Sequence, residues 1–192
     1  MTKDIGQINT IYTIGDSHCW HAWLKVPNVI TKTMGPMTMH SLGLSKPLLI
    51  KDLPKDSPIV FCWGEIDCRC HVHKYQPWKE TIDVLVKNYI DTITLNAKIN
   101  KNILIFNVIP PPRKKTAQES SGFPFLGTDE ERLSYVKYMN KLLSESEYPF
   151  IDVYDKYSES DGFLKMELSD YHVHVEDEKY LIEWINNNRE KS

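Results

Sequence analysis

The segment Ile11-Tyr12-Thr13-Ile14-Gly15-Asp16-Ser17-His18 begins as a β-branched run and breaks into Gly-Asp-Ser. The β-branched residues predict a strand, and Gly15 permits a tight turn directly after it. Ser17 is thereby placed just past a strand end, a position in which α/β enzymes hold a nucleophilic serine. If the next residues, 18–24, are helical, free N–H groups at the helix start favour negative charge developing beside Ser17. A Gly-Asp-Ser turn without catalysis explains this stretch alone equally well.

A second group of reactive side chains lies near the other end of the chain. The stretch Ser169-Asp170-Tyr171-His172-Val173-His174 offers a carboxylate and two imidazoles just before residues 176–185, which predict the last helix. A serine is a poor nucleophile at neutral pH and needs an imidazole within hydrogen-bond reach, itself oriented by an acceptor. Asp170 and one of the two histidines can supply that acceptor and that base.

Gly-Asp-Ser near the N-terminus and Asp…His ahead of a terminal helix together resemble the SGNH (GDSL) hydrolase superfamily. The middle blocks of that superfamily have counterparts in this chain. Gly35, within Thr33–Thr38, matches the glycine of the second block, and Gly64-Glu65-Ile66-Asp67 matches the third block, which usually reads Gly-x-Asn-Asp. The four anchors follow in the family's order between residues 11 and 180, and that order is much more specific than any single anchor.

The resemblance implies a serine esterase with three catalytic residues. Ser17 would attack the ester carbonyl, His174 would take its proton, and Asp170 would hold the imidazole. The backbone N–H groups of Ser17 and Gly35 would bind the oxyanion, with further N–H groups around Gly64. No cofactor is implied, because water completes the turnover, and the expected partner is a small-molecule or glycan ester.

The chain departs from the family's pattern at two places. Ile66 stands where the family has an oxyanion-hole asparagine, and its side chain cannot donate a hydrogen bond. The spacing from Asp170 to His174 is one residue longer than the usual Asp-x-x-His. We choose His174 because the run from His174 to Tyr180 matches the family's His-Pro-Asn-x-x-Gly-Tyr, and His172 remains the alternative.

The run Gly64-Glu-Ile-Asp-Cys-Arg69 resembles a subgroup of the superfamily that is often found near polysaccharide-modifying genes. This resemblance implies an acylated sugar as the substrate. Asp67 is expected to brace the site. Arg69 either anchors an anionic or carbonyl group of the substrate or forms an internal salt bridge. Asp16 is expected to brace the serine turn through an Asx-type hydrogen bond.

Strand and helix patterns alternate along the whole chain. Apolar runs predict five strands, over Ile11–Ile14, Val26–Thr33, Ile59–Trp63, Ile103–Ile109 and Pro149–Val153. Apolar periodicity predicts helices over Trp78–Ala97, from a capping box at Thr128–Glu131 onward, and over Asp177–Asn188. This order predicts a parallel five-stranded sheet between helices, a three-layer α/β/α fold of the flavodoxin-like type, with its site at the carboxyl ends of the strands.

Composition and charge limit the class of protein. The 192 residues suit a single domain over residues 1–192, with a net charge of −3 and a hydrophobic content of 41%. This charge gives no electrostatic case for binding nucleic acid or an anionic membrane. No apolar run approaches a membrane span of about 20 residues, and the N-terminal residues lack the apolar core of a signal peptide. We therefore expect a cytoplasmic location.

One tract of the chain combines cysteines and histidines, which are possible metal ligands. The tract Cys68–His73 resembles a metal motif, but one residue separates its cysteines and no matching pair follows, so we expect no metal. We expect free thiols at all four cysteines, which are Cys19, Cys62, Cys68 and Cys70. The other histidines are expected on the surface or in packing; they are His18, His21, His40, His71 and His73.

The sequence leaves two alternatives open for the role of Trp20 and two for the role of one long loop. The five tryptophans are expected mainly in the core, although Trp20 is close enough to Ser17 to line a pocket. The irregular segment 110–127 is either a mobile surface loop with a basic patch or a substrate lid that carries Phe123 and Phe125.

Two functions besides hydrolysis stay open. An O-acyltransferase acting on glycans would use the same three residues and pass the acyl group to a sugar hydroxyl. A non-catalytic glycan-binding module is consistent with Ile66 in place of the asparagine. An acyl-ester assay on the wild type and on Ser17→Ala separates enzyme from binding module.

Overall fold

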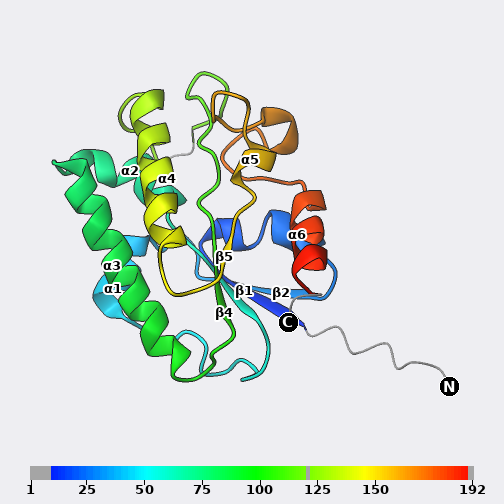
Figure 1. Cartoon of the computed structure of the whole chain (residues 1–192). Helices are drawn as coiled ribbons and strands as arrows, with labels where there is room; N and C mark the ends of the chain where they lie inside the picture. Colours follow the sequence, from blue (N-terminus) through cyan, green and yellow to red (C-terminus); the bar gives the residue numbers. More distant parts are fainter. Residues whose placement is uncertain (1–9, 120–121, 190–192) are drawn as a thin grey trace.

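The computed structural model describes residues 10–119 and 122–189 of the chain. Five parallel strands form one sheet in the order β2-β1-β3-β4-β5 (Figure 1). The strands are β1 (Ile11–Gly15), β2 (Val29–Thr33), β3 (Ile59–Cys62), β4 (Ile103–Phe106) and β5 (Phe150–Ile151). The predicted three-layer α/β/α fold with a five-stranded parallel sheet is confirmed.

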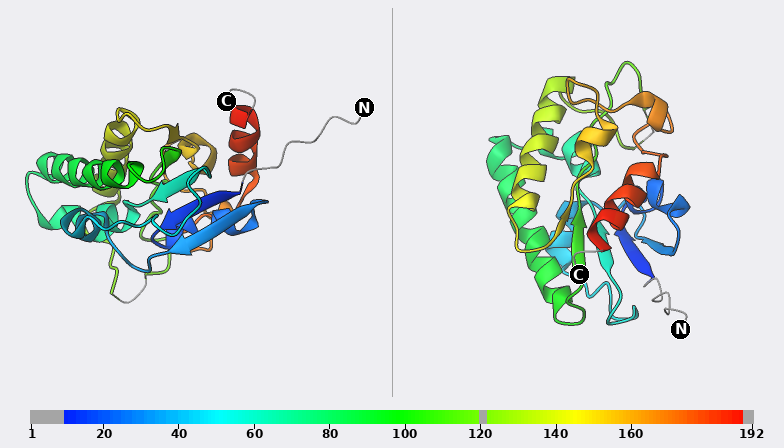
Figure 2. Two further views of the ribbon diagram at one scale, coloured as in Figure 1. Left: turned by 90° about the horizontal axis from the view of Figure 1, so that it is seen from below. Right: turned by 45° about the vertical axis from the view of Figure 1, so that its right-hand side comes forward.

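Helices cover both faces of this sheet. They are α1 (Met39–Ser45), α2 (Glu65–Cys70), α3 (Trp78–Ala97), α4 (Asp129–Ser144), α5 (Tyr154–Tyr157) and α6 (Lys179–Arg189). Short 3₁₀ helices are η1 (Ser17–Cys19), η2 (Ala22–Lys25), η3 (Val72–Lys74) and η4 (Met166–Leu168). Figures 1 and 2 show α1, α3 and α4 on one face of the sheet and α6 on the other.

The side chains of each strand point alternately to the two faces of the sheet, so the hydrophobic core consists of two clusters, one on each face. On β3, Ile59 and Phe61 belong to the cluster with α1, α3 and α4, whereas Val60 and Cys62 belong to the cluster with η2 and α6. Successive side chains of a strand point to opposite faces, so a continuous apolar run is what a doubly covered strand requires. The sheet is therefore packed between two hydrophobic clusters, which fix the positions of its strand ends.

The strand order places the reversal of winding between β1 and β3. From β1 the chain goes outward to β2 and then returns to the other side of β1 to form β3, so these neighbours are where the winding reverses. In such sheets the loops after the two strands diverge and leave a ligand site at their carboxyl ends. Ser17 follows β1 and Gly64 follows β3. A Cβ atom on Gly15 would lie 2.0 Å from the Cys62 carbonyl oxygen, so only glycine allows these two strand ends to approach this closely.

Most of the predicted elements are present, with differences at their boundaries. The helix over Trp78–Ala97 has the predicted bounds, and Thr128 and Glu131 form the predicted capping box at the start of α4. The last helix begins at Lys179 and not at Asp177. Residues 18–24 form parts of two 3₁₀ helices, so the possible single helix after Ser17 is replaced by two short turns.

Four of the five predicted strands are longer than the observed ones, whereas β1 extends one residue beyond its predicted end, to Gly15. The second strand begins at Val29 because Asn28 adopts a left-handed conformation with φ of 60°. The fourth strand ends at Phe106: the Asn107 N–H still donates to the Ile151 carbonyl at 3.1 Å, but the Val108 N–H donates to Asn140 Oδ1 at 2.7 Å. Among the helices of the described residues, none combines the length and apolar character that a bilayer crossing requires.

Candidate active site

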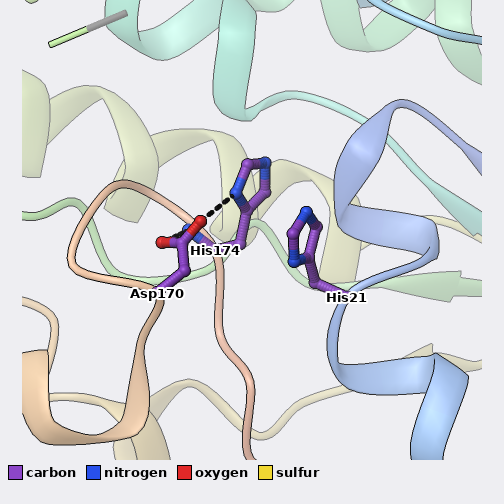
Figure 3. Close-up of side chains that lie close together, drawn as sticks. All are labelled: His21, Asp170 and His174. Carbon is purple, nitrogen blue, oxygen red and sulfur yellow. Dashed lines mark hydrogen bonds and ion pairs between the residues drawn. The ribbon is translucent and has the colours of Figure 1, made fainter. Parts of the chain in front are cut away.

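Ser17, His174 and Asp170 form a chain of hydrogen bonds at the edge of the sheet. His174 Nε2 lies 2.8 Å from Ser17 Oγ, and His174 Nδ1 lies 2.6 Å from Asp170 Oδ2. Figure 3 shows the second of these contacts. With Nδ1 donating to the carboxylate, Nε2 is free to accept the serine proton. The structure thus brings together the three residues that the sequence predicts as catalytic, although 157 positions separate Ser17 from His174.

The serine turn is held by the aspartate that precedes it. Asp16 is the N-cap of η1, and its Oδ1 accepts the backbone N–H of His18 at 2.9 Å, the predicted Asx-type bond. Ser17 is the first residue of η1, where the backbone N–H has no partner within the helix. That N–H is therefore available to a ligand oxygen, as the oxyanion prediction for Ser17 requires.

The loop that carries His174 is folded around Asp170. Asp170 Oδ1 accepts the backbone N–H groups of His172 at 2.8 Å and His174 at 3.1 Å, and the Asp170 N–H donates to the His174 carbonyl at 3.1 Å. Tyr171 adopts a left-handed conformation with φ of 58° within this turn. The tight turn accommodates the extra residue of the Asp-to-His spacing and still aims both side chains at each other.

The alternative base, His172, faces elsewhere. Its Nδ1 contacts the Gln118 carbonyl oxygen, while the Gln118 N–H donates to the Tyr171 carbonyl at 3.0 Å. His172 therefore ties its loop to the segment 110–127. The geometry favours His174 as the residue that bonds Ser17.

The surroundings of His174 and Asp170 determine the charge of each side chain. Burial and the neighbouring charge of His18 lower the pKa of His174 to about 3, although the Asp170 carboxylate opposes this shift. The hydrogen bond from His174 and two backbone N–H groups outweigh the burial of Asp170 and hold its pKa below the usual range. At neutral pH the imidazole is neutral and the carboxylate is ionised, as a general base and its orienting group must be.

His18 and His21, which follow Ser17 in the chain (residues 17–21, the serine segment), both contact His174. The sequence analysis assigned neither of them to the site. The His18 ring lies 4.7 Å from the His174 ring, centroid to centroid. The His21 ring stacks on the His174 ring at 3.8 Å with 9° between the planes (Figure 3). The expected packing role therefore places both of these rings against His174. Their positions one and four residues after Ser17 would have suggested a role, because one turn of helix brings both to the serine.

The other expected oxyanion positions surround the same edge. Gly35 is left-handed with φ of 66°, and its N–H donates to Thr33 Oγ1 at 3.2 Å, a partner that an incoming carbonyl oxygen must replace. Gly64 is the N-cap of α2 with φ of 119°, and a Cβ there would lie 2.8 Å from Val108 Cγ2. Ile66 is buried, 4% exposed, so an apolar side chain lies where the resemblance to the SGNH superfamily predicts an asparagine.

Asp67 and Arg69 hold elements together. Asp67 accepts the N–H groups of Met39 at 2.6 Å and His40 at 3.1 Å and so joins α2 to the start of α1. Burial raises the pKa of Asp67 to about 7. Arg69 forms a two-pronged, buried ion pair with Glu65, at 2.7 Å and 3.0 Å. Of the two possibilities for Arg69, the internal salt bridge is the one observed.

The segment 110–127 is anchored to this ion pair. Arg69 Nη1 donates to the Phe123 carbonyl at 2.6 Å, and the Leu126 N–H donates to the Arg69 carbonyl at 3.0 Å. Phe125 is buried, with the guanidinium groups of Arg69 and Arg132 at 5.5 Å and 5.2 Å from its ring centroid. Phe125 is therefore an internal anchor and cannot serve as the exposed lid residue that the sequence suggested; residues 120 and 121 lie outside the described part.

Metal-ligating side chains also meet at this site. Ligand atoms of His21, Asp170 and His174 lie within 4.8 Å of one another. Nδ1 of His174 is already hydrogen-bonded to Asp170 Oδ2 at 2.6 Å, so a metal ion bound through these two atoms would have to displace that bond.

The predicted free thiols are confirmed at all four cysteines, each buried. Cys68 Sγ donates to Met139 Sδ and Cys70 Sγ to the Ile66 carbonyl, and burial raises the pKa of both thiols, that of Cys70 to about 11. The Cys68–His73 tract therefore directs its thiols into the protein.

No protein-family model matches the chain, and no curated protein does either. Solved structures do. A GDSL-like lipase from Bacteroides thetaiotaomicron matches with a TM-score of 0.62 and 15% identity over 100% of this chain and 92% of its own. A putative acylhydrolase from Bacteroides fragilis has a TM-score of 0.62 and 16% identity over 99% and 90%. An acetylxylan esterase from Geobacillus stearothermophilus, solved as a catalytic mutant, has a TM-score of 0.57 and 15% identity over 97% and 95%. This chain therefore shares the fold of GDSL-like hydrolases over nearly its whole length.

Proposed function

We propose that this protein is a serine esterase of the SGNH (GDSL) superfamily that hydrolyses small acyl esters. The observation that carries the proposal is the chain Ser17 Oγ, His174 Nε2, His174 Nδ1 and Asp170 Oδ2, joined at 2.8 Å and 2.6 Å. A hydroxyl, a neutral imidazole and a carboxylate in this order are the parts that acyl transfer to water needs. The shared fold with GDSL-like hydrolases supports the proposal.

The reaction follows from these positions. Ser17 Oγ attacks the ester carbonyl as its proton passes to His174 Nε2, and the Asp170 carboxylate stabilises the imidazolium that forms. The backbone N–H of Ser17, with that of Gly35 once Thr33 Oγ1 is displaced, stabilises the oxyanion. The imidazolium then protonates the leaving alcohol, which leaves the acyl group as an ester on Ser17 Oγ. A water molecule attacks this ester as its proton passes to His174 Nε2, and the imidazolium returns that proton to Ser17 Oγ as the acid leaves.

We propose an O-acetylated sugar or polysaccharide as the substrate class. Trp20 is 42% exposed and packs edge-on against His21 at 5.0 Å, so an apolar ring surface lies open next to the ring that stacks on His174. Sugar rings pack their C–H faces on such surfaces, as amphipathic aromatic side chains allow. One structural neighbour is an acetylxylan esterase, which supports this class.

The test begins with p-nitrophenyl acetate and the pair wild type and Ser17→Ala. Wild-type hydrolysis should fall by about 10³-fold or more in Ser17→Ala, because the nucleophile is removed while the fold is kept. A fluorophosphonate should add its mass to the peptide that contains Ser17. Full activity in Ser17→Ala, or labelling at another residue alone, would refute the proposal.

The substrate class needs its own measurement. Acetate release from a panel of acetylated xylo-, gluco- and manno-oligosaccharides should exceed release from simple alkyl acetates, and Trp20→Ala should raise KM for the sugars while leaving p-nitrophenyl acetate hydrolysis nearly unchanged. Equal rates on sugar and alkyl esters would remove the sugar from the proposal and leave the esterase.

A further inference from the structure

We propose that His18 and His21 are positioning residues that hold His174 in its bonding orientation and in its neutral form. His18 acts as a buried cation that joins the serine turn to the histidine loop, and His21 acts as a neutral ring that supports the face of His174. This inference rests on the proposed role of the Ser17–His174 pair.

The hydrogen bonds of His18 identify it as a cation. Its Nδ1 lies 3.0 Å from Asp16 Oδ1, and its Nε2 lies 3.3 Å from the Val173 carbonyl oxygen. A carboxylate and a carbonyl are both acceptors, so both ring nitrogens must donate, and an imidazole that donates from both nitrogens is protonated. Burial alone lowers the pKa of His18, but the carboxylates of Asp16 and Glu65 together raise it above its usual value.

One of these bonds, from His18 to the Val173 carbonyl, links distant parts of the chain. His18 is adjacent to Ser17, and Val173 is adjacent to His174, so the bond from His18 Nε2 fixes the nucleophile and the base relative to each other across 155 positions. The pair is nearly enclosed, because the His18 and Asp16 side chains are only 7% and 1% exposed. An enclosed, charge-assisted bond resists separation better than an exposed one.

His21 restrains the ring of His174 from a second direction. The two rings are stacked at 3.8 Å and nearly parallel, so the His174 imidazole cannot turn about its bond to the chain without losing this contact. His21 is itself held by its backbone N–H, which donates to the Ser17 carbonyl at 3.4 Å, and by Glu176 at 3.8 Å. Burial lowers the pKa of His21, so its ring is neutral at neutral pH and adds no second charge.

The charges around His174 come from several elements. Asp170 and the His172 ring lie on its own loop, and His18 and His21 lie on the serine segment. Glu65 of α2 interacts with both His18 and His174, and Arg69 of α2 with His18. Of these groups, the His18 cation disfavours a second positive charge on His174, so His174 remains ready to accept a proton in mildly acidic solution.

The experiment combines NMR titration with the pH profile of kcat/KM. Imidazole ¹⁵N shifts of the wild-type protein should show His18 protonated on both nitrogens at pH 7 and His174 neutral. In His18→Gln, which keeps a donor but removes the charge, the acid-limb pKa of kcat/KM should rise by at least half a unit, with kcat lowered about fivefold and KM within twofold. His73→Gln, which removes a histidine away from this group, should change none of these quantities.

The role of His21 is tested in the same assays. His21→Phe keeps a ring on the face of His174 and should retain most of kcat, whereas His21→Ala should lower kcat several-fold with KM unchanged. A neutral His18 at pH 7, or an unmoved acid limb in folded His18→Gln, would overturn the proposal for His18. Equal kcat in the Phe and Ala variants would overturn it for His21. If the wild type hydrolyses no ester, the NMR titrations still decide the charge states, so failure of the proposed function remains distinguishable.

Discussion

Two aspartate–histidine pairs lie side by side at this site and hold opposite charge states. In Asp170–His174 the atoms are 2.6 Å apart, and in Asp16–His18 they are 3.0 Å apart. The two imidazole rings are only 4.7 Å from each other. Nevertheless, the pKa of His174 is lowered by burial to about 3, while that of His18 is raised.

The difference comes from the second nitrogen of each ring. His18 Nε2 faces a carbonyl, which only accepts, whereas His174 Nε2 faces the Ser17 hydroxyl, which can donate. A further carboxylate, Glu65, adds to the stabilisation of the His18 cation. The same pair of residue types therefore makes a fixed cation in one place and a neutral base in the other, and the neighbours decide which.

The largest expected effect is the loss of kcat on removal of His174, compared with removal of His172. His174→Ala should lower kcat by about 10³-fold or more, because no other imidazole reaches Ser17 Oγ in the described part of the chain. His172→Ala, as the control, should retain about half of the activity or more. Substantial activity in His174→Ala, measured on p-nitrophenyl acetate, would mean that the pair Asp170–His174 is not the catalytic one.

Changing Asp170, the acid of the proposed catalytic pair, should affect the rate more than the stability. Asp170→Asn should lower kcat by about 10²–10⁴-fold, because the amide favours the wrong tautomer of His174. The midpoint of thermal unfolding should change little, since Asp170 is partly exposed at 20% of its side chain. A variant that loses stability in proportion to its activity would contradict this division.

Changing Asp16, the acid of the other pair, should instead have its main effect on the stability. Asp16→Asn leaves the buried His18 without its counter-charge, and the free energy of unfolding should fall by about 3 kcal/mol at pH 7. Denaturant unfolding of wild type, Asp16→Asn and Asp170→Asn measures this contrast directly. Equal stability in the two variants would show that the Asp16–His18 pair is not a buried ion pair.

The wild-type pH profile tests the charge state of His174. His174 must be neutral to accept the Ser17 proton, and its lowered pKa keeps it neutral as the pH falls. We therefore expect kcat/KM to stay flat down to well below pH 6.5, the pKa of a free imidazole. Asp67→Asn is the control, because burial raises the pKa of Asp67 to about 7 and its titration could add a separate step. An acid limb at or above 6.5 that persists in this variant would refute the expectation.

The smallest expected effect lies at the oxyanion position. Ile66→Asn should raise turnover a few-fold or leave it unchanged, because it supplies the side-chain donor that the resemblance to the SGNH superfamily predicts at this position. Thermal unfolding must be measured alongside, since a buried polar group without a partner costs about 1–3 kcal/mol. Complete loss of activity in a folded variant would show that Ile66 packs against the substrate or the catalytic residues, and the alignment of this block would be wrong.

Much of the fold could be predicted because its signals are local. The bounds of α3 follow from apolar periodicity, and the start of α4 follows from the Thr128–Glu131 capping box, both set by residues within a few positions. Strand ends were overestimated, because the apolar run to Ile109 continues after strand pairing stops at Phe106. At Val108 the side chain of Asn140, from α4, takes the place of the neighbouring strand as the partner of the backbone N–H.

The sequence by itself determined the alternation of strands and helices and the chemical types at the site: a serine after Gly-Asp, and Asp170 and His174 before the last helix. Only the tertiary structure decided the roles of Arg69, His18 and His21. Arg69 had two possible partners, and packing placed Glu65 at 2.7 Å. The charge of a histidine depends on the burial and the acceptors that reach both of its nitrogens, and for His18 one of those acceptors is the Val173 carbonyl, 155 positions away, which only the folded chain brings within hydrogen-bond distance.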